Sequence, residues 1–204
     1  DIRVSGLVRT RDTSGVVGVA SPELPVMLYL RETPMTVTTD SIRELANESQ
    51  GKADRDRIEV LHDVMLRIAK AVDYKPGETH VHTTGAEALE QGSGVCQDLA
   101  HIFCAAARSL DIPARYVSGY IETLPPAGHA RLQGADASHA WFAVFVPGTG
   151  WVDFDPTNDH MPRDHHITVA WGRDYADVTP LKGVVFSSGS HELSVRVDVE
   201  RVAG

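Results

Sequence analysis

Apolar residues recur at intervals of three and four in two stretches of the chain, residues 54–72 and 95–110. This period places them on one face of a helix, so the sequence predicts two amphipathic helices. Two shorter helices are also expected. One begins near Ser41, which has the spacing of a capping box with Glu44, and the other covers residues 86–90.

The segments on either side of these helices are typical of β-strands. Residues 1–38 contain short runs rich in valine, leucine and threonine, and prolines interrupt them. After the helices, apolar and polar residues alternate in several further segments. These segments are residues 114–122, 138–146, 151–157, 166–172, 183–188 and 191–202. This order predicts an α+β fold in which the helices pack on an antiparallel sheet.

The sequence predicts two parts, a β-rich segment of residues 1–38 and one domain of residues 39–204. A segment of strands this short would be marginally stable alone. We expect it either to pack on the domain or to be the remnant of a larger N-terminal β-module. Because the chain begins at Asp1 rather than at a methionine, we also expect its N-terminus to be incomplete.

Composition limits the classes of partner. The 204 residues include 19 lysines and arginines against 28 aspartates and glutamates, a formal charge of −9. A chain with this charge repels phosphate, so no nucleic-acid partner is expected. No run approaches the roughly 18 apolar residues of a membrane helix, so no membrane partner is expected. Nothing in the sequence indicates an oligomeric state.

The two cysteines differ in their predicted positions. Cys96 follows Gly94 and lies at the start of a predicted helix, where unpaired backbone N–H groups and the helix dipole stabilise a thiolate. A reactive thiol and a small buried residue are equally good interpretations of Cys96 taken alone. Cys104 lies within the same helix, away from any loop, and is expected to be a core residue.

A cysteine nucleophile needs a base and a group that orients the base. His139 begins an apolar strand, and Asp155 ends the next strand, just before Pro156. In a hairpin these two strand ends meet, so His139 and Asp155 are predicted to be neighbours. Asp153 shares a strand face with Asp155, and we favour Asp155 because it lies at the strand end, beside a predicted cleft.

The register of this hairpin stays open. A two-residue loop at residues 148–149 would pair position 139 with position 158 and place His139 and Asp155 on opposite faces. A three-residue loop at residues 146–148, or a bulge, would place His139 directly opposite Asp155.

The histidine pairs suggest a metal site, but neither pair is sufficient. His80 and His82 would share one face of a strand, whereas His165 and His166 are adjacent and would point in opposite directions. No third ligand at metal-site spacing accompanies either pair, and no HExxH motif is present. We therefore expect neither a metal ion nor another cofactor.

Four blocks of sequence resemble one known family. They are GVCQDLAH, IPARYVSGY, SHAWFAVF and GWVDFDPTN. Their order resembles the transglutaminase-like superfamily of papain-related cysteine enzymes, and more narrowly its bacterial branch of transglutaminase-like cysteine proteases. The resemblance covers about residues 40–200. It implies a papain-like core with Cys96 as nucleophile, His139 as base and Asp155 as the third member of a catalytic triad.

The resemblance also implies an activity. A cysteine-nucleophile amide hydrolase would act on a peptide or protein amide through a thioacyl-enzyme intermediate. The alternatives are transglutaminase-type acyl transfer to an amine, or a peptide-binding module without catalysis. The calcium sites of animal transglutaminases and the cysteine zinc site of the peptide-N-glycanase relatives are not recognisable. A free thiolate favours a reducing compartment, so a cytoplasmic location is expected.

Overall fold

The structure is a computed structural model that describes residues 3–19, 25–51, 56–122, 138–180, 182–183, 197–199 and 202. Its main sheet has the strand order β1-β6-β5-β4-β7, and every neighbouring pair is antiparallel. The strands are β1 (Val16–Gly18), β4 (Ala114–Ile121), β5 (His139–Val146), β6 (Gly150–Phe154) and β7 (His166–Gly172). A second, parallel pair joins β2 (Asp73–Tyr74) to β3 (Ser93–Gly94).

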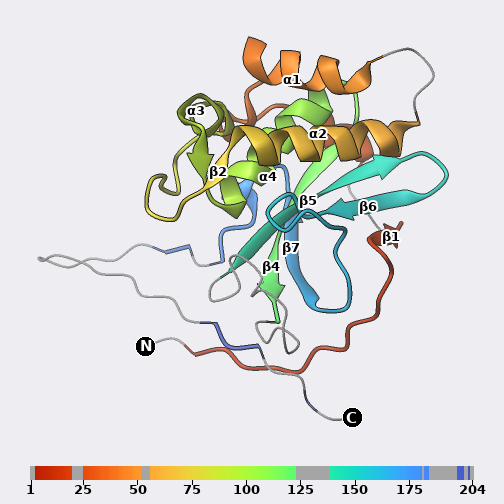
Figure 1. Cartoon of the computed structure of the whole chain (residues 1–204). Helices are drawn as coiled ribbons and strands as arrows, with labels where there is room; N and C mark the ends of the chain where they lie inside the picture. Colours follow the sequence, from red (N-terminus) through yellow and green to blue (C-terminus); the bar gives the residue numbers. More distant parts are fainter. Residues whose placement is uncertain are drawn as a thin grey trace, which may run out of the picture.

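The helices gather on one side of the main sheet (Figure 1). They are α1 (Asp40–Gln50), α2 (Arg57–Ala71), α3 (Gly85–Gln91) and α4 (Cys96–Ser109). Helix α4 lies against both the other helices and the sheet, and every one of its residues except Gln97 and Ser109 is buried. The predicted α+β fold, with helices packed on an antiparallel sheet, is therefore confirmed.

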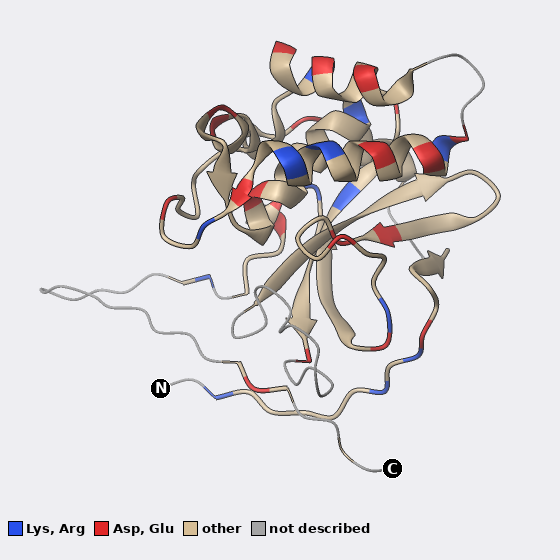
Figure 2. Cartoon of the chain, in the orientation of Figure 1, with Lys and Arg blue, Asp and Glu red and all other residues tan. Residues whose placement is uncertain are grey.

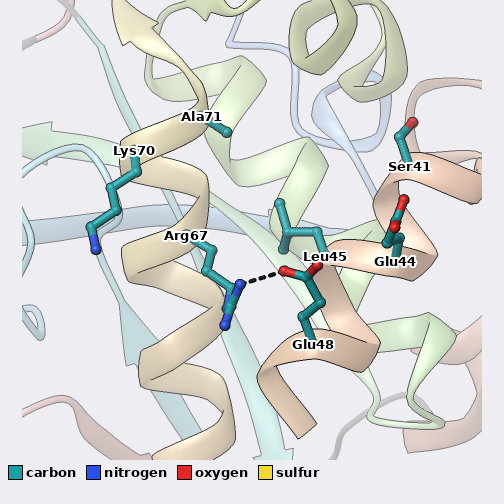
Figure 3. A pocket seen from close by; sticks show the side chains of 7 residues that line it. All are labelled: Ser41, Glu44, Leu45, Glu48, Arg67, Lys70 and Ala71. Carbon is teal, nitrogen blue, oxygen red and sulfur yellow. Dashed lines mark hydrogen bonds and ion pairs between the residues drawn. The ribbon is translucent and has the colours of Figure 1, made fainter. Parts of the chain in front are cut away.

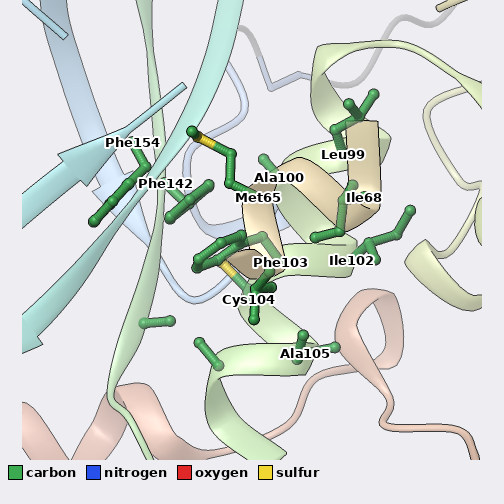
Figure 4. Close-up of a cluster of buried hydrophobic side chains, with 14 of the residues drawn as sticks. Met65, Ile68, Leu99, Ala100, Ile102, Phe103, Cys104, Ala105, Phe142 and Phe154 are labelled. Carbon is green, nitrogen blue, oxygen red and sulfur yellow. The ribbon is translucent and has the colours of Figure 1, made fainter. Parts of the chain in front are cut away.

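The main core forms where α4 meets α2 and the sheet. Phe103 of α4 stacks on Phe142 of β5, which in turn stacks on Phe154 of β6. Met65 and Ile68 of α2 are buried in the same cluster (Figure 4). Burying such side chains contributes about 1.5–3 kcal/mol each, so this cluster holds α4 firmly against the strands.

The ends of the helices differ slightly from the prediction. Helix α1 is capped by Thr39, whose hydroxyl accepts the Ile42 N–H, whereas the sequence predicted a cap at Ser41. Thr39 is the cap because its backbone is extended, as a capping residue requires, whereas Ser41 already lies within the helix. Helix α3 has a capping box between Thr84 and Glu87.

The N-terminal segment contains less strand than predicted. Its only strand among the described residues is β1, and residues 26–30 and 34–36 form 3-10 helices where strands were expected. Pro25 and Pro34, which cannot donate to a β-ladder, precede or begin these turns. The Arg108 side chain of α4 donates to the Tyr29 carbonyl and to the Thr36 hydroxyl. The segment therefore packs on the rest of the chain, which was one of the two expectations; its origin in a larger β-module stays a prediction.

Other predictions lie outside the described residues. The polar loop that the sequence indicates at residues 123–137 is among them, as are most of the strand expected at residues 183–188 and most of the strand expected at residues 191–202. Charged residues gather on α1 and α2, whereas the sheet carries few (Figure 2). Within the described ranges, none of the helices has the length and apolar character needed to cross a bilayer.

Candidate active site

Cys96 is the first residue of α4, and the chain before it is held by the β2–β3 pair. Gly94 of β3 leaves no room for a side chain, because a Cβ there would lie 2.8 Å from Asp98 Oδ2. That oxygen accepts the Val95 N–H at 2.8 Å and the Thr79 hydroxyl at 2.7 Å. The first turn of α4 is thus fixed by its own third residue, and the Cys96 thiol lies at the end of the helix with unpaired N–H groups.

The structure brings His139 and Asp155 into direct contact. His139 Nε2 lies 2.8 Å from Asp155 Oδ2, and neither side chain is exposed. The hairpin has neither register considered from the sequence: Val146 pairs with Gly150, so the loop is residues 147–149. Continued in this register, His139 would face Thr157, and the Asp155 side chain reaches it diagonally on the same face of the hairpin.

The Asp155 carboxylate accepts five hydrogen bonds. Oδ1 accepts the backbone N–H groups of Thr157 and Asn158 at 3.0 and 3.3 Å, which closes the turn after β6. Oδ2 accepts His139 Nε2, His166 Nε2 at 3.1 Å and the Asn158 side-chain amide at 2.9 Å. Burial alone would raise the pKa of Asp155, but the charge and hydrogen bond of His139, with those of His166, hold the pKa well below its usual range. Asp155 is therefore a carboxylate at neutral pH.

The two nitrogens of His139 face different groups. Because Nε2 is bound to Asp155, Nδ1 is the nitrogen available to the Cys96 thiol, and it has no other hydrogen-bond partner among the described residues. Burial would lower the pKa of His139, but Asp155, and after it Cys96, raise the pKa to about 10. His139 is thus an imidazolium at neutral pH, the form that stabilises a neighbouring thiolate.

Cys104 has a different environment, as the sequence predicted. Its side chain is completely buried in the core cluster, beside Phe103 (Figure 4). Burial raises the pKa of the Cys104 thiol to about 11. A thiol in these surroundings is a packing group.

His166 also contributes to the site, a role that was not expected from the sequence. The Arg163 backbone N–H donates to His166 Nδ1 at 3.3 Å, so Nε2 carries the proton that Asp155 accepts. Burial lowers the pKa of His166 to about 4, and the imidazole is neutral. No sequence pattern reveals this contact, because it depends on the pairing of β7 with β4.

No role was expected for Tyr74. It lies in β2, opposite Gly94, and its pKa is raised to about 12 by burial first and then by the negative charges of Cys96 and Asp155. The phenol therefore lies near both groups and stays protonated.

The histidine pairs are arranged differently from the prediction. His80 and His82 lie in a loop rather than a strand, and both are exposed. His165 and His166 are joined by a third imidazole, His160, and one nitrogen of each lies within 4.8 Å of the others. The expectation that no third ligand accompanies this pair was wrong, because the turn after β6 folds His160 back to pair with Asp155.

A surface hollow lies between α1 and α2 and is separate from the site around Cys96. Its lining includes Leu45, and an ion pair between Arg67 and Glu48 crosses it (Figure 3). Neither Cys96 nor His139 lines it. The site around Cys96 is therefore defined by its side-chain chemistry and not by this hollow.

A Cys–His–Asp arrangement at the start of a helix that packs on an antiparallel sheet agrees with the comparison with protein families. A model of the transglutaminase-like superfamily matches residues 43–156, more than half of the chain. The chain belongs to the transglutaminase-like superfamily. The match includes Cys96, His139 and Asp155.

Individual relatives agree with this membership. An uncharacterized protein of Mycobacterium tuberculosis is 41% identical over 166 residues, which cover 79% of this chain and 52% of the relative. A protein-glutamine gamma-glutamyltransferase of Pseudomonas aeruginosa is 35% identical over 86 residues, 39% of this chain and 13% of that protein. The chain thus spans about half the length of the mycobacterial relative.

One solved structure supports the fold of this superfamily member over most of its length. A candidate cysteine protease of Cytophaga hutchinsonii superposes with a TM-score of 0.63 and 28% identity. The superposition covers 83% of this chain and 55% of the other. The transglutaminase-like, papain-related fold expected from the sequence is confirmed.

Proposed function

We propose that this transglutaminase-like domain is an amide hydrolase with Cys96 as nucleophile, His139 as acid and base, and Asp155 as the group that orients His139. The observation that carries the proposal is the division of the His139 ring between its two partners. Asp155 holds Nε2 at 2.8 Å, and Nδ1 is left for the thiol of Cys96. A binding module would have no need to bury a charged pair beside a cysteine, because such burial is costly.

In the first half of the reaction, the Cys96 thiolate attacks the carbonyl carbon of a peptide or protein amide and a C–S bond forms. The backbone N–H groups of the first turn of α4 would stabilise the oxyanion. His139 then donates its Nδ1 proton to the departing amine as the C–N bond breaks, which leaves a thioester on Cys96.

In the second half, neutral His139 takes a proton from water, and the resulting hydroxide attacks the thioester. The C–S bond breaks, the carboxylic acid product leaves, and the thiolate–imidazolium pair is restored. A primary amine in place of water would make the reaction a transglutamination. The match to a gamma-glutamyltransferase covers 39% of this chain and keeps this second activity as the alternative. A thiolate nucleophile also favours a reducing compartment.

The test compares the two cysteines. Mild alkylation with iodoacetamide should label the native protein once, Cys96→Ala should abolish the labelling, and Cys104→Ala should leave it unchanged. Peptide cleavage should disappear in Cys96→Ala and persist in Cys104→Ala. Equal labelling of the two variants would refute the proposed nucleophile. Adding a fluorescent primary amine to each assay separates transfer from hydrolysis, because only transfer attaches the amine to the acyl product.

A further inference from the structure

A cluster of three imidazoles lies beside the proposed catalytic group, and two of them, His160 and His165, have no role in the reaction described above. His160 and His165 come from the segment between β6 and β7, and His166 is the first residue of β7. Their ring centroids lie 5.6 Å (His160–His165), 5.3 Å (His160–His166) and 4.5 Å (His165–His166) apart. One nitrogen from each residue lies within 4.8 Å of the other two.

The hydrogen bonding of this cluster is incomplete. Both ring nitrogens of His160 and Nε2 of His165 are buried and have no hydrogen-bond partner among the described residues. Leaving a buried polar atom unpaired costs about 1–3 kcal/mol. Each of the three imidazoles has one ring nitrogen close to the other two rings, and a ring nitrogen without a proton can give its lone pair to a metal ion. A cation that accepts these lone pairs would satisfy the atoms that the protein leaves unpaired.

The outer contacts of the cluster also fit a metal site. Histidine ligands commonly donate their second N–H group to a carboxylate, which orients the ring and raises its basicity. His166 makes such a contact, because its Nε2 donates to Asp155, whereas His165 Nδ1 lies 3.8 Å from an Asp164 oxygen, too far for a hydrogen bond. Since Nε2 of His166 donates to Asp155, a metal would bind Nδ1, and it would replace the 3.3 Å hydrogen bond that Nδ1 accepts from the Arg163 N–H.

We propose that His160, His165 and His166 bind one divalent transition-metal ion of the zinc class, and that the bound ion lowers the reactivity of Cys96 through Asp155. Three imidazoles are ligands for zinc, nickel or copper rather than for magnesium or calcium, which prefer oxygen. A fourth position would be left for water or for a further ligand.

The coupling follows from one shared oxygen, and this part rests on the proposed function. Asp155 Oδ2 accepts hydrogen bonds from both His139 and His166. A metal on His166 would make its Nε2–H a stronger donor to that oxygen. Asp155 would then hold the His139 ring less firmly, and His139 would be less well placed to assist Cys96. We expect zinc to slow reactions of Cys96 about tenfold, within the usual range of coupling between two sites.

Binding is tested without activity. Untagged Cys96→Ala protein, in which the reactive thiol cannot itself bind the metal, is titrated with zinc in competition with a chromophoric chelator. One zinc per chain is expected, and adding His160→Gln or His165→Gln should weaken binding at least about tenfold. The matched control carries His80→Gln and His82→Gln, which remove an exposed pair in a loop, and it should bind as before. Circular dichroism checks that each variant is folded. Absence of stoichiometric binding, or full affinity in His160→Gln, would overturn the site.

The coupling is tested by the rate at which iodoacetamide alkylates Cys96, with and without zinc. Zinc should slow alkylation of the otherwise unchanged chain and leave the His160→Gln/His165→Gln double variant unaffected. Equal slowing in both would mean that zinc binds Cys96 directly, and no slowing despite stoichiometric binding would mean that the two sites are independent; either result refutes the coupling. Because this measurement needs no substrate, a failure to find hydrolysis would count against the proposed function and leave the metal site to be judged on its own.

Discussion

Two buried carboxylates, two residues apart at the end of the same strand, have opposite charge preferences. Asp153 lies within β6, and its Oδ2 accepts the Trp141 indole N–H at 2.9 Å, while Oδ1 has no hydrogen-bond partner in the described part of the chain. Burial raises the pKa of Asp153 to about 6, against smaller opposing effects of Trp141 and Arg115. Asp155 is at least as deeply buried, and yet its pKa lies well below the usual range.

The pKa values of Asp153 and Asp155 differ because the two carboxyl groups have different hydrogen-bond partners. Burial disfavours the charged form of both carboxyls. Asp155 overcomes this cost because it accepts five hydrogen bonds, one of them from the imidazolium of His139. Asp153 accepts the uncharged Trp141 N–H, and Arg115, whose guanidinium lies over the rings of Trp151 and Trp171, lowers its pKa by less than burial raises it. The same strand end thus holds one carboxylate built to orient a base and one that supports packing.

Asp155→Asn should have the largest effect of any substitution at these two carboxylates. The amide keeps the shape but removes the charge that holds His139 as an imidazolium, so amide hydrolysis should fall about 10²- to 10⁴-fold. Asp153→Asn keeps an acceptor for Trp141 and should stay within about threefold of the parent, a change of under about 1 kcal/mol in the barrier. Rate measurements on one peptide substrate decide the matter. Equal losses in the two variants would remove the distinction between these carboxylates.

Asp155→Ala should also cost about 3–5 kcal/mol of unfolding free energy, because it leaves the buried His139 charge without its partner. The folded pKa of Asp155 lies below its unfolded value, so its stabilisation is present above about pH 4 and is lost as the pH falls. The folded pKa of His139 is raised to about 10. The stabilisation that His139 contributes is therefore complete below about pH 6.5 and is lost as the pH rises toward 10.

Urea unfolding over a range of pH provides the measurement for this stability effect. The difference between parent and Asp155→Ala should be greatest between about pH 4 and 6.5 and smaller on both sides. A constant difference at every pH would show that lost packing, and not the ion pair, explains the cost.

Asp153→Asn should have the opposite effect on the pH dependence of stability. Because the folded state of the parent retains a proton on Asp153 up to about pH 6, the unfolded state ionises first, and stability falls as the pH rises from about 4 to 6. The loss should approach about 3 kcal/mol. The asparagine cannot ionise, so its unfolding free energy should lack this decline. If urea unfolding of parent and variant follows the same curve over this interval, Asp153 is already ionised at low pH.

The sequence predicted the members of the proposed triad but not the way in which they meet. Cys96, His139 and Asp155 could be chosen because each lies at an element boundary with a local signal, namely a glycine before a helix, a strand start and an Asp-Pro turn. Strand parity could not separate Asp153 from Asp155, because both share one face of β6.

The remaining contacts of the site depend on tertiary pairing. Neither hairpin register considered from the sequence occurs, because the loop is residues 147–149, a choice that turn composition alone does not settle. His166 reaches Asp155 only because β7 pairs with β4 on the other side from β5. His160 joins the cluster because the turn after β6 pairs it with Asp155, and the periodicity of the sequence does not indicate such a turn. The 3-10 turns of residues 26–36 were missed for a similar reason, since Arg108 from α4 holds them.

Asn158→Ala should have the smallest effect, and it tests a single hydrogen bond among those that distinguish Asp155 from Asp153. It removes one neutral donor, the side-chain amide that Asp155 Oδ2 accepts at 2.9 Å, and leaves the Asn158 backbone N–H on Oδ1. The expected cost is about 1 kcal/mol of unfolding free energy, with a fall in the hydrolysis rate of up to about tenfold. Thr157→Ala is the matched control, because its backbone N–H still binds Oδ1 and its hydroxyl has no hydrogen-bond partner among the described residues. If both variants lose the same activity, the turn acts through its backbone shape. If only Asn158→Ala loses activity, each hydrogen bond to Asp155 contributes separately to the charge that makes this carboxylate differ from Asp153.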